Sequence, residues 1–237
     1  MSMKRALGRL VAALSSALAA CLVAAPPAAA TSVDTPIQAG GHFSVPIQSM
    51  KAVRYRSTIR QQYDFSCGSA SLATLLTHHY GYAIREENAF TEMFQNGDSD
   101  KIRREGFSLF DIKRFLERHG FQANGYEARL EALEQAKIPA IVLINEHGYN
   151  HFVVIKGLRA GRVLIGDPST GVRALPREDF ERVWTNRIMF IIQSHQDRAA
   201  FNRDADWALA PASPLHAGVA RNGLESVMLL KRGTGDF

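Results

Sequence analysis

Two hydrophobic patterns divide the chain into a helical first part and a strand-rich second part. Over residues 67–81, small and apolar residues recur at helical spacing and a glycine follows, which predicts a helix with a glycine stop. Helical spacing dominates from there to residue 137. Over residues 138–192 the apolar residues come in short runs, which predicts strands, with one interrupting helix over 176–184.

This order of elements predicts the fold class and the domain limits. Helices followed by antiparallel strands are typical of an α+β domain, which we place over residues 55–193, with the active site between its two parts. Residues 31–54 have no clear period and predict a linker or N-terminal arm. Residues 194–237 predict a partly ordered C-terminal tail, with docking onto an export partner as the alternative interpretation.

The composition is that of an ordinary globular protein. The chain has 237 residues, of which 46% are hydrophobic, enough for one core but not for two full domains. The formal net charge is +5, but Lys4, Arg5 and Arg9 belong to a leader-like segment, and about +2 remains without them. No basic stripe is interleaved with aromatic residues, so we predict no nucleic-acid partner.

Residues 1–30 predict a signal peptide. Basic residues precede an apolar run that ends before two prolines, and small residues up to Ala30 suit a cleavage site. The apolar run is shorter than the roughly 20 residues that a membrane-spanning helix needs. We therefore expect cleavage near Ala30 and a periplasmic or secreted protein. The lipobox-like sequence Leu18–Cys21 makes a lipoprotein anchored at Cys21 the alternative.

Cysteine usage introduces the first chemical candidate. The chain has two cysteines, and Cys21 lies in the predicted leader, so Cys67 has no partner for an internal disulfide. Cys67 begins the first predicted helix, where unpaired amide groups and the helix dipole favour a thiolate. A buried structural cysteine is more typical of the middle of a helix face. We interpret Cys67 as a nucleophile.

A thiolate needs a base, and His151 is the best placed of the eight histidines. It begins an apolar strand, and a turn and a returning strand lead to Asp167, so a hairpin brings the two side chains together. A carboxylate in that place orients the imidazole and supports its charge. His147 lies four residues before His151, but Gly148 and Asn150 break a helix and no third ligand is near. We therefore predict no metal and no cofactor.

Two adjacent glutamines precede the cysteine. Acyl-transfer chemistry needs two fixed donors for the developing oxyanion, and the backbone N–H of Cys67 with a side-chain amide just upstream supplies such a pair. Gln61 and Gln62 are both placed for this role. The sequence pattern by itself does not choose between them.

These residues together resemble a known family. Gln61 and Cys67 lie in the string Q-x5-C-G-x-A-S-L-A, His151 begins HFVVI, and Asp167 begins D-P-x-x-G. Over roughly residues 55–193 the chain is similar to the bacteriocin-leader peptidases, cysteine peptidase family thirty-nine. The resemblance implies a papain-like fold, with the nucleophile on the helical part and His and Asp on an antiparallel sheet. It also assigns the oxyanion amide to Gln61.

The resemblance implies a cysteine peptidase with a polypeptide substrate. The motif R-Q-Q-x-D-F-S-C-G is most similar to stand-alone exported members found beside outer-membrane export systems for surface fibres such as functional amyloid, and such a system is the expected partner. Ser66 stands where the leader peptidases have aspartate, so their double-glycine specificity is not carried over. An acyl or amide transferase on the same scaffold and a non-catalytic peptide-binding module are the alternatives.

Overall fold

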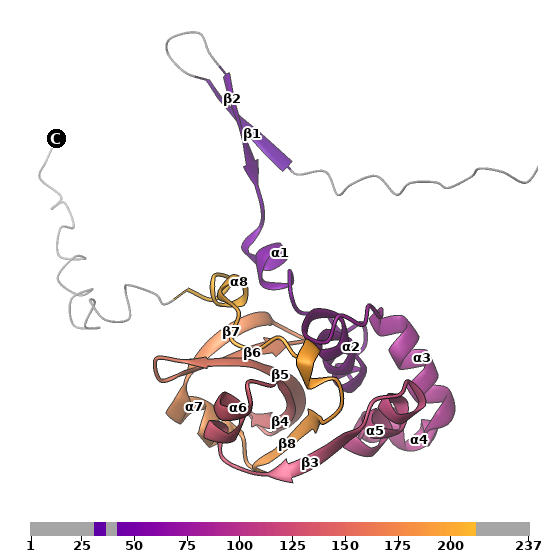
Figure 1. Cartoon of the computed structure of the whole chain (residues 1–237). Helices are drawn as coiled ribbons and strands as arrows, with labels where there is room; N and C mark the ends of the chain where they lie inside the picture. Colours follow the sequence, from indigo (N-terminus) through magenta and orange to yellow (C-terminus); the bar gives the residue numbers. More distant parts are fainter. Residues whose placement is uncertain (1–30, 37–41, 212–237) are drawn as a thin grey trace, which may run out of the picture. The chain divides into compact units, whose positions relative to one another are not determined.

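The computed structural model describes residues 31–36 and 42–211 (Figure 1). The predicted signal peptide, with Cys21, and residues 212–237 of the predicted tail lie outside this part of the chain. Within it, no helix has the length and apolar character needed to cross a membrane.

The segment predicted to be an N-terminal arm contains a hairpin. The chain divides into two units, Met1–Gln48 and Ser49–Phe237, and in the first of them β1 (Thr31–Pro36) pairs antiparallel with β2 (His42–Ile47). The sequence pattern predicted no element here, because each short strand includes a proline, which interrupts the usual strand signal.

The second unit combines helices with a six-stranded antiparallel sheet, which confirms the α+β prediction. Its helices are α1 (Met50–Arg54), α2 (Cys67–His79), α3 (Glu86–Asn96), α4 (Ser99–Glu105), α5 (Leu109–Arg118), α6 (Leu130–Ala136), α7 (Arg177–Val183) and α8 (Asp204–Trp207), with a 3-10 turn η1 (Gln196–Arg198). Its strands are β3 (Ala123–Glu127), β4 (Ala140–Glu146), β5 (Tyr149–Arg159), β6 (Arg162–Asp167), β7 (Gly171–Pro176) and β8 (Ile188–Ile192). Their order across the sheet is β3-β8-β4-β5-β6-β7.

Helices cover both faces of the sheet and enclose two hydrophobic cores (Figure 1). On one face, side chains of α2, α3 and α5 pack with Ile141, Phe152 and Val154. On the other, side chains of α6 and α7 pack with Val142 and Val153. Because β5 is buried on both faces, its sequence is a continuous apolar run and not an alternating one.

The start of α2 is held close to the sheet and to the segment before α5. Ser71 Oγ donates a hydrogen bond to the carbonyl oxygen of Phe152 on β5, at 3.0 Å. A Cβ added at Gly68 would lie 2.8 Å from Cβ of Phe107, so only glycine permits this approach. The first turn of α2 is therefore fixed beside the beginning of β5.

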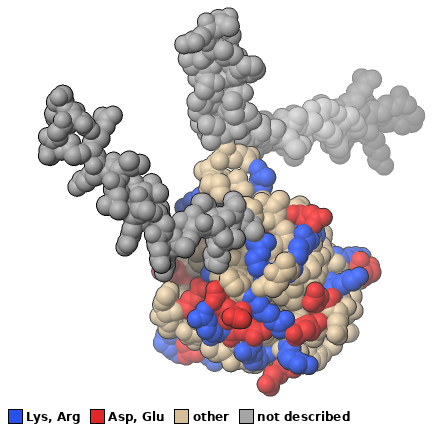
Figure 2. All heavy atoms as spheres, turned by 90° about the vertical axis from the view of Figure 1, so that its left-hand side faces the viewer, with Lys and Arg blue, Asp and Glu red and all other residues tan. Residues whose placement is uncertain are grey.

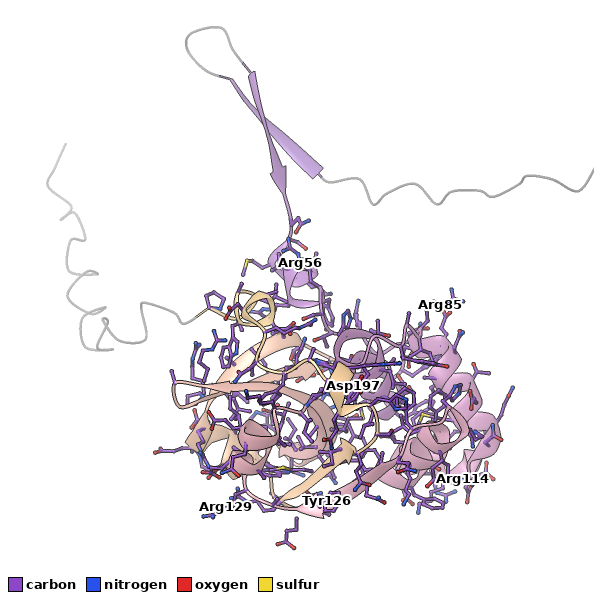
Figure 3. The ribbon with its side chains drawn as sticks, in the orientation of Figure 1. Arg56, Arg85, Arg114, Tyr126, Arg129 and Asp197 are labelled. Atoms are coloured by element: carbon purple, nitrogen blue, oxygen red, sulfur yellow. The ribbon has the colours of Figure 1, made fainter. Side chains whose placement is uncertain are left out.

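Strand β3 lies in the part of the chain that the sequence pattern predicted to be helical. Its residues include Asn124 and Gly125, and it is buried only at Ala123, so it has no apolar alternation. It forms by pairing with β8, more than sixty residues later in the chain. Tyr126 marks this outer edge of the domain in Figure 3, and its side chain is 41% exposed.

The first part of the predicted tail belongs to the folded domain. Asn202 donates its backbone N–H to the Lys156 carbonyl at 2.8 Å, and its side chain bonds both backbone groups of Leu158. A Cβ added at Gly157 would lie 2.5 Å from Asn202 Oδ1, so glycine is needed where the tail crosses β5. Trp207 then packs into a third hydrophobic cluster on β6 and β7.

A buried ion pair joins this tail to β5. Lys156 is fully buried, and its Nζ donates to Asp206 Oδ1 at 3.0 Å and to the Ser57 carbonyl at 2.6 Å. Burial lowers the pKa of Lys156 to about 8, although Asp206 opposes this. Burial raises the pKa of Asp206, but Arg203 and Lys156 outweigh it and hold that pKa well below its usual range. Each of the two side chains therefore favours the charged form of the other.

Ion pairs on the surface contribute less to stability than the buried pair of Lys156 and Asp206. Figure 2 shows Lys and Arg interspersed with Asp and Glu over one face of the molecule. Exposed pairs such as Arg159 with Asp204, at 2.8 Å, are screened by water and contribute little to stability.

We predict that Asp206→Ala lowers the free energy of unfolding by about 3–5 kcal/mol, because it leaves Lys156 buried without a counter-charge. Urea unfolding followed by circular dichroism measures this. The matched control is Asp204→Ala in the same helix, where the side chain is 92% exposed and a change below about 1 kcal/mol is expected. Equal losses in the two variants would contradict the role of the buried pair.

Candidate active site

Cys67 is the first residue of α2, as the sequence pattern predicted. The turn before it is closed by Ser66, whose hydroxyl donates to the Tyr63 carbonyl at 3.0 Å and accepts from the Tyr63 N–H at 3.1 Å. The sulfur lies at the positive end of the helix dipole, an environment that favours a thiolate. Cys67 is 6% exposed, and within the described part of the chain it forms no disulfide.

The structure brings His151 and Asp167 into direct contact. His151 lies near the start of β5, and Asp167 is the last residue of the neighbouring antiparallel strand β6. His151 Nε2 donates to Asp167 Oδ1 at 2.8 Å, and the two side chains are only 7% and 2% exposed. The hairpin therefore places the carboxylate where the sequence analysis expected it.

The pair is charged. Burial by itself lowers the pKa of His151, but the hydrogen bond and charge of Asp167, with a contribution from the Cys67 thiol, raise it to about 9. Burial raises the pKa of Asp167, but His151 and Ser169 outweigh it and hold that pKa well below its usual range. At neutral pH the site therefore contains an imidazolium beside a carboxylate. The second imidazole nitrogen, Nδ1, is buried and has no hydrogen-bonding partner among the described residues.

Ser169 is a site residue that the sequence analysis missed. Its backbone N–H and its hydroxyl donate to Asp167 Oδ1, at 2.8 and 2.7 Å. The sequence signal was Asp-Pro-Ser-Thr, because Asp side chains commonly accept hydrogen bonds from the backbone two residues later. This turn is tied to the segment before the nucleophile by the Gln61 N–H, which donates to the Pro168 carbonyl at 3.1 Å.

The structure separates the two candidate glutamines. Gln61 is half-buried, its Nε2 donates to the Tyr63 carbonyl at 3.1 Å, and its Oε1 is buried without a partner among the described residues. Gln62 is exposed and lines a different hollow, together with His78. Of the two, Gln61 is the glutamine that is partly buried and whose backbone is tied to the turn after Asp167.

Tyr149 is a second residue that the sequence analysis missed. Its hydroxyl donates to the Asp64 carbonyl at 2.7 Å, and its ring centroid lies 6.0 Å from that of His151. The side chain is 53% exposed, so it lies at the rim of the site and ties β5 to the segment before Cys67. No local pattern indicated this contact, because the partner is a backbone carbonyl 85 residues away.

Other histidines have contacts elsewhere. His79 is buried on α2, its Nδ1 lies 2.5 Å from the Ala200 carbonyl, and burial lowers its pKa to about 3. His119 follows α5 and pairs with Glu92 at 2.9 Å. His147 lies in the turn between β4 and β5.

A largely apolar cavity of about 660 Å³ opens beside the thiol. It is lined by Cys67, Glu105, Gly106, Phe107, Ser108, Leu109, Phe110, Leu143, Asn150 and Phe152. A neighbouring hollow of about 450 Å³ shares two of these residues, Leu109 and Phe110, and extends to β3 and β8. Phe110 lines both hollows and is 64% exposed.

Known proteins are similar to this chain over the segment that contains the site residues. The model of the Peptidase C39 family matches residues 56–196. The "Probable functional amyloid protease FapD" of Pseudomonas fluorescens is 36% identical over 181 residues, which cover 76% of this chain and 77% of that protein. The protein of the same name from Pseudomonas aeruginosa is 36% identical over 186 residues, 78% of each chain. The lactococcin-G-processing and transport ATP-binding protein LagD of Lactococcus lactis is 30% identical over 57% of this chain but only 18% of its own.

Solved structures are also similar. The double glycine motif protease from an AMS/PCAT transporter, in complex with the leader peptide, is 30% identical with a TM-score of 0.47, over 57% of this chain and 89% of that one. The peptidase domain of Streptococcus ComA is 21% identical with a TM-score of 0.48, over 57% of this chain and 96% of that one.

We predict that His151→Ala and Asp167→Asn each move the onset of Cys67 alkylation by iodoacetamide to higher pH. The imidazolium persists up to about pH 9 in the intact pair, and it stabilises the thiolate below that pH. Alkylation rates measured between pH 5 and 10 test this. The control is His119→Ala, which removes another carboxylate-paired histidine. If the wild type and the three variants share one pH profile, His151 and Asp167 do not activate Cys67.

Proposed function

We propose that this chain, which belongs to the peptidase C39 family and is a cysteine peptidase, cleaves peptide bonds in an exported polypeptide. The cleavage proceeds through an acyl-enzyme intermediate. One observation carries the proposal. The buried side chains of His151 and Asp167 form a hydrogen bond of 2.8 Å, and Cys67, at the start of α2, interacts with the same imidazole. This is the arrangement that a nucleophile, a base and an orienting group require.

The chemistry proceeds in two steps. The Cys67 thiolate attacks the carbonyl carbon, and the imidazolium of His151 gives its proton to the leaving amine, which departs and leaves a thioester. The neutral imidazole then removes a proton from water, which attacks the thioester and releases the acid. Asp167 remains ionised throughout, because its role is to orient the imidazole and stabilise its charged form.

The oxyanion of each tetrahedral intermediate is stabilised by the Cys67 N–H and the Gln61 amide. The backbone of Gln61 is held by the Pro168 carbonyl, next to Asp167, which supports this role. One N–H of the Gln61 amide donates to the Tyr63 carbonyl, and the proposed role requires the second N–H to donate to the oxyanion.

The cavity beside Cys67 receives the polypeptide. Its lining is largely apolar, and the neighbouring hollow prolongs it past Phe110, which gives room for several substrate residues. The Pseudomonas relatives are named as functional amyloid proteases. This name supports a secreted fibre protein as substrate and an outer-membrane export system as partner, and the signal-peptide pattern of residues 1–30 supports a periplasmic or secreted location.

We predict that Gln61→Ala lowers the turnover rate by about 10²–10³-fold, because it removes one oxyanion donor. Gln62→Ala is the matched control and should leave turnover unchanged, since that side chain is exposed. Initial rates of substrate cleavage measure both. An effect confined to Gln62→Ala would transfer the oxyanion role to the neighbouring residue.

In cells that produce this protein, we predict that Cys67→Ala stops processing of the secreted substrate while the variant accumulates, folded, in the periplasmic fraction. Immunoblots of fractionated cells measure the substrate and the enzyme. Cys21→Ser should leave fractionation unchanged if the leader is cleaved near Ala30, whereas loss from the membrane fraction would indicate a lipoprotein. Full processing without the thiol would refute the proposed function.

A further inference from the structure

The two oxygens of the Asp167 carboxylate have different partners. Oδ1 accepts hydrogen bonds from His151 Nε2 at 2.8 Å, from the backbone and hydroxyl of Ser169 at 2.8 and 2.7 Å, and from the Thr170 N–H at 3.3 Å. Apart from His151, these donors belong to the turn that follows Asp167. They hold one end of the carboxylate and leave the other oxygen, Oδ2, to be satisfied from elsewhere.

Arg173 satisfies that second oxygen. Its Nε donates to Asp167 Oδ2 at 3.2 Å, and its Nη2 lies 3.1 Å from the same oxygen. Because the Asp167 side chain is 2% exposed, water cannot readily replace this partner. Arg173 lies on the edge strand β7, two residues after the D-P-x-x-G motif ends at Gly171, so the motif itself does not indicate it.

Glu146 holds Arg173 in place. Arg173 Nη2 donates to Glu146 Oε2 at 2.8 Å, and Glu146 is the last residue of β4. The guanidinium therefore bridges β7 and β4 across the ends of β5 and β6, where His151 and Asp167 lie. A planar guanidinium that is bound to the carboxylates of both Asp167 and Glu146 has little freedom to rotate.

We propose that Arg173 is a positioning residue of the peptidase, and that Glu146 anchors it. By holding Oδ2, Arg173 fixes the plane of the Asp167 carboxylate and thereby directs Oδ1 at His151 Nε2. The proposal rests on the proposed function, because it assigns Arg173 a role through the pair formed by His151 and Asp167. It adds the side chains of Arg173 and Glu146 to the network that begins at Cys67.

The alternative is an ordinary surface ion pair, and the chain offers a matched case. Arg177 also bonds two carboxylates, Glu131 at 2.6 Å and Glu181 at 2.8 Å, but its partners belong to α6 and α7 and not to the active site. A purely structural role predicts that loss of either arginine has the same effect. A positioning role predicts an effect on His151 from Arg173 alone.

The test compares the double variant Arg173→Met/Glu146→Gln with the control Arg177→Met/Glu131→Gln. Each double variant removes one positive and one negative charge, so the net charge of the chain is unchanged. Two readouts are measured on the full chain: the NMR titration of the His151 imidazole, and the rate of alkylation by iodoacetamide against pH. Cys67, Tyr149 and Tyr55, the other titratable groups near the pair, are unaltered in both.

In the Arg173 double variant we expect His151 to titrate at least one pH unit below its value of about 9, because a loosely held carboxylate supports the imidazolium less well. A fall of one unit lowers the fraction of imidazolium at pH 8.5 by about threefold, so alkylation between about pH 8 and 9 should slow by a similar factor. The control should match the wild type in both readouts. Arg173→Lys keeps the charge without the planar fork and should lie between them.

A folded Arg173 double variant that titrates and reacts like the wild type would overturn the proposal. If that variant does not fold, Arg173→Lys decides by the same criterion, because it retains the charge. Failure of the proposed function is a separate outcome, in which Cys67→Ala keeps its processing activity whatever the Arg173 variants do.

Discussion

A charged imidazolium and carboxylate buried at one end of the sheet are the constraint on which the rest of the structure depends. Charges of this kind are costly to remove from water unless every polar atom around them is paired. For the carboxylate of Asp167, the chain meets this requirement with donors in the turn that follows it and with Arg173 on β7. The antiparallel register of β5 and β6 then keeps His151 within 2.8 Å of its carboxylate. Helix α2 supplies the thiol to this pair because its first turn is packed against β5 and Phe107.

A second buried ion pair lies further along β5, and it explains why the tail is part of the domain. Lys156 lies five residues after His151, and its counter-charge, Asp206, comes from beyond residue 196, where the family match ends. The part of the chain that the family model matches is therefore completed by a segment that follows it. Because Gly157 and Asn202 fit together without room for another side chain, this segment and β5 depend on each other. This segment stabilises β5 from a position away from the rim of the active site. The rim, at Tyr149, remains exposed.

Much of the domain was predictable because its signals are local. The apolar run after His151, the helical spacing after Cys67 and the turn before Arg162 each depend on residues close in sequence, and each element formed where it was expected. Strand β3 was missed because the strand with which it pairs, β8, lies more than sixty residues later in the chain. Tyr149 and Arg173 were missed for the same reason, since their contacts join segments that are far apart in the chain.

The sequence by itself determined the family, the α+β order and the four residue types expected for acyl-enzyme chemistry, because motif spacing and hydrophobic period are properties of neighbouring residues. It left Gln61 and Gln62 equivalent from physics alone. Only the tertiary structure decided which glutamine is tied to the turn after Asp167, that Glu146 on β4 anchors Arg173, and that the tail around Asp206 packs on β5. These features depend on contacts between strands and loops that are remote in sequence, and such contacts exist only once the chain has packed.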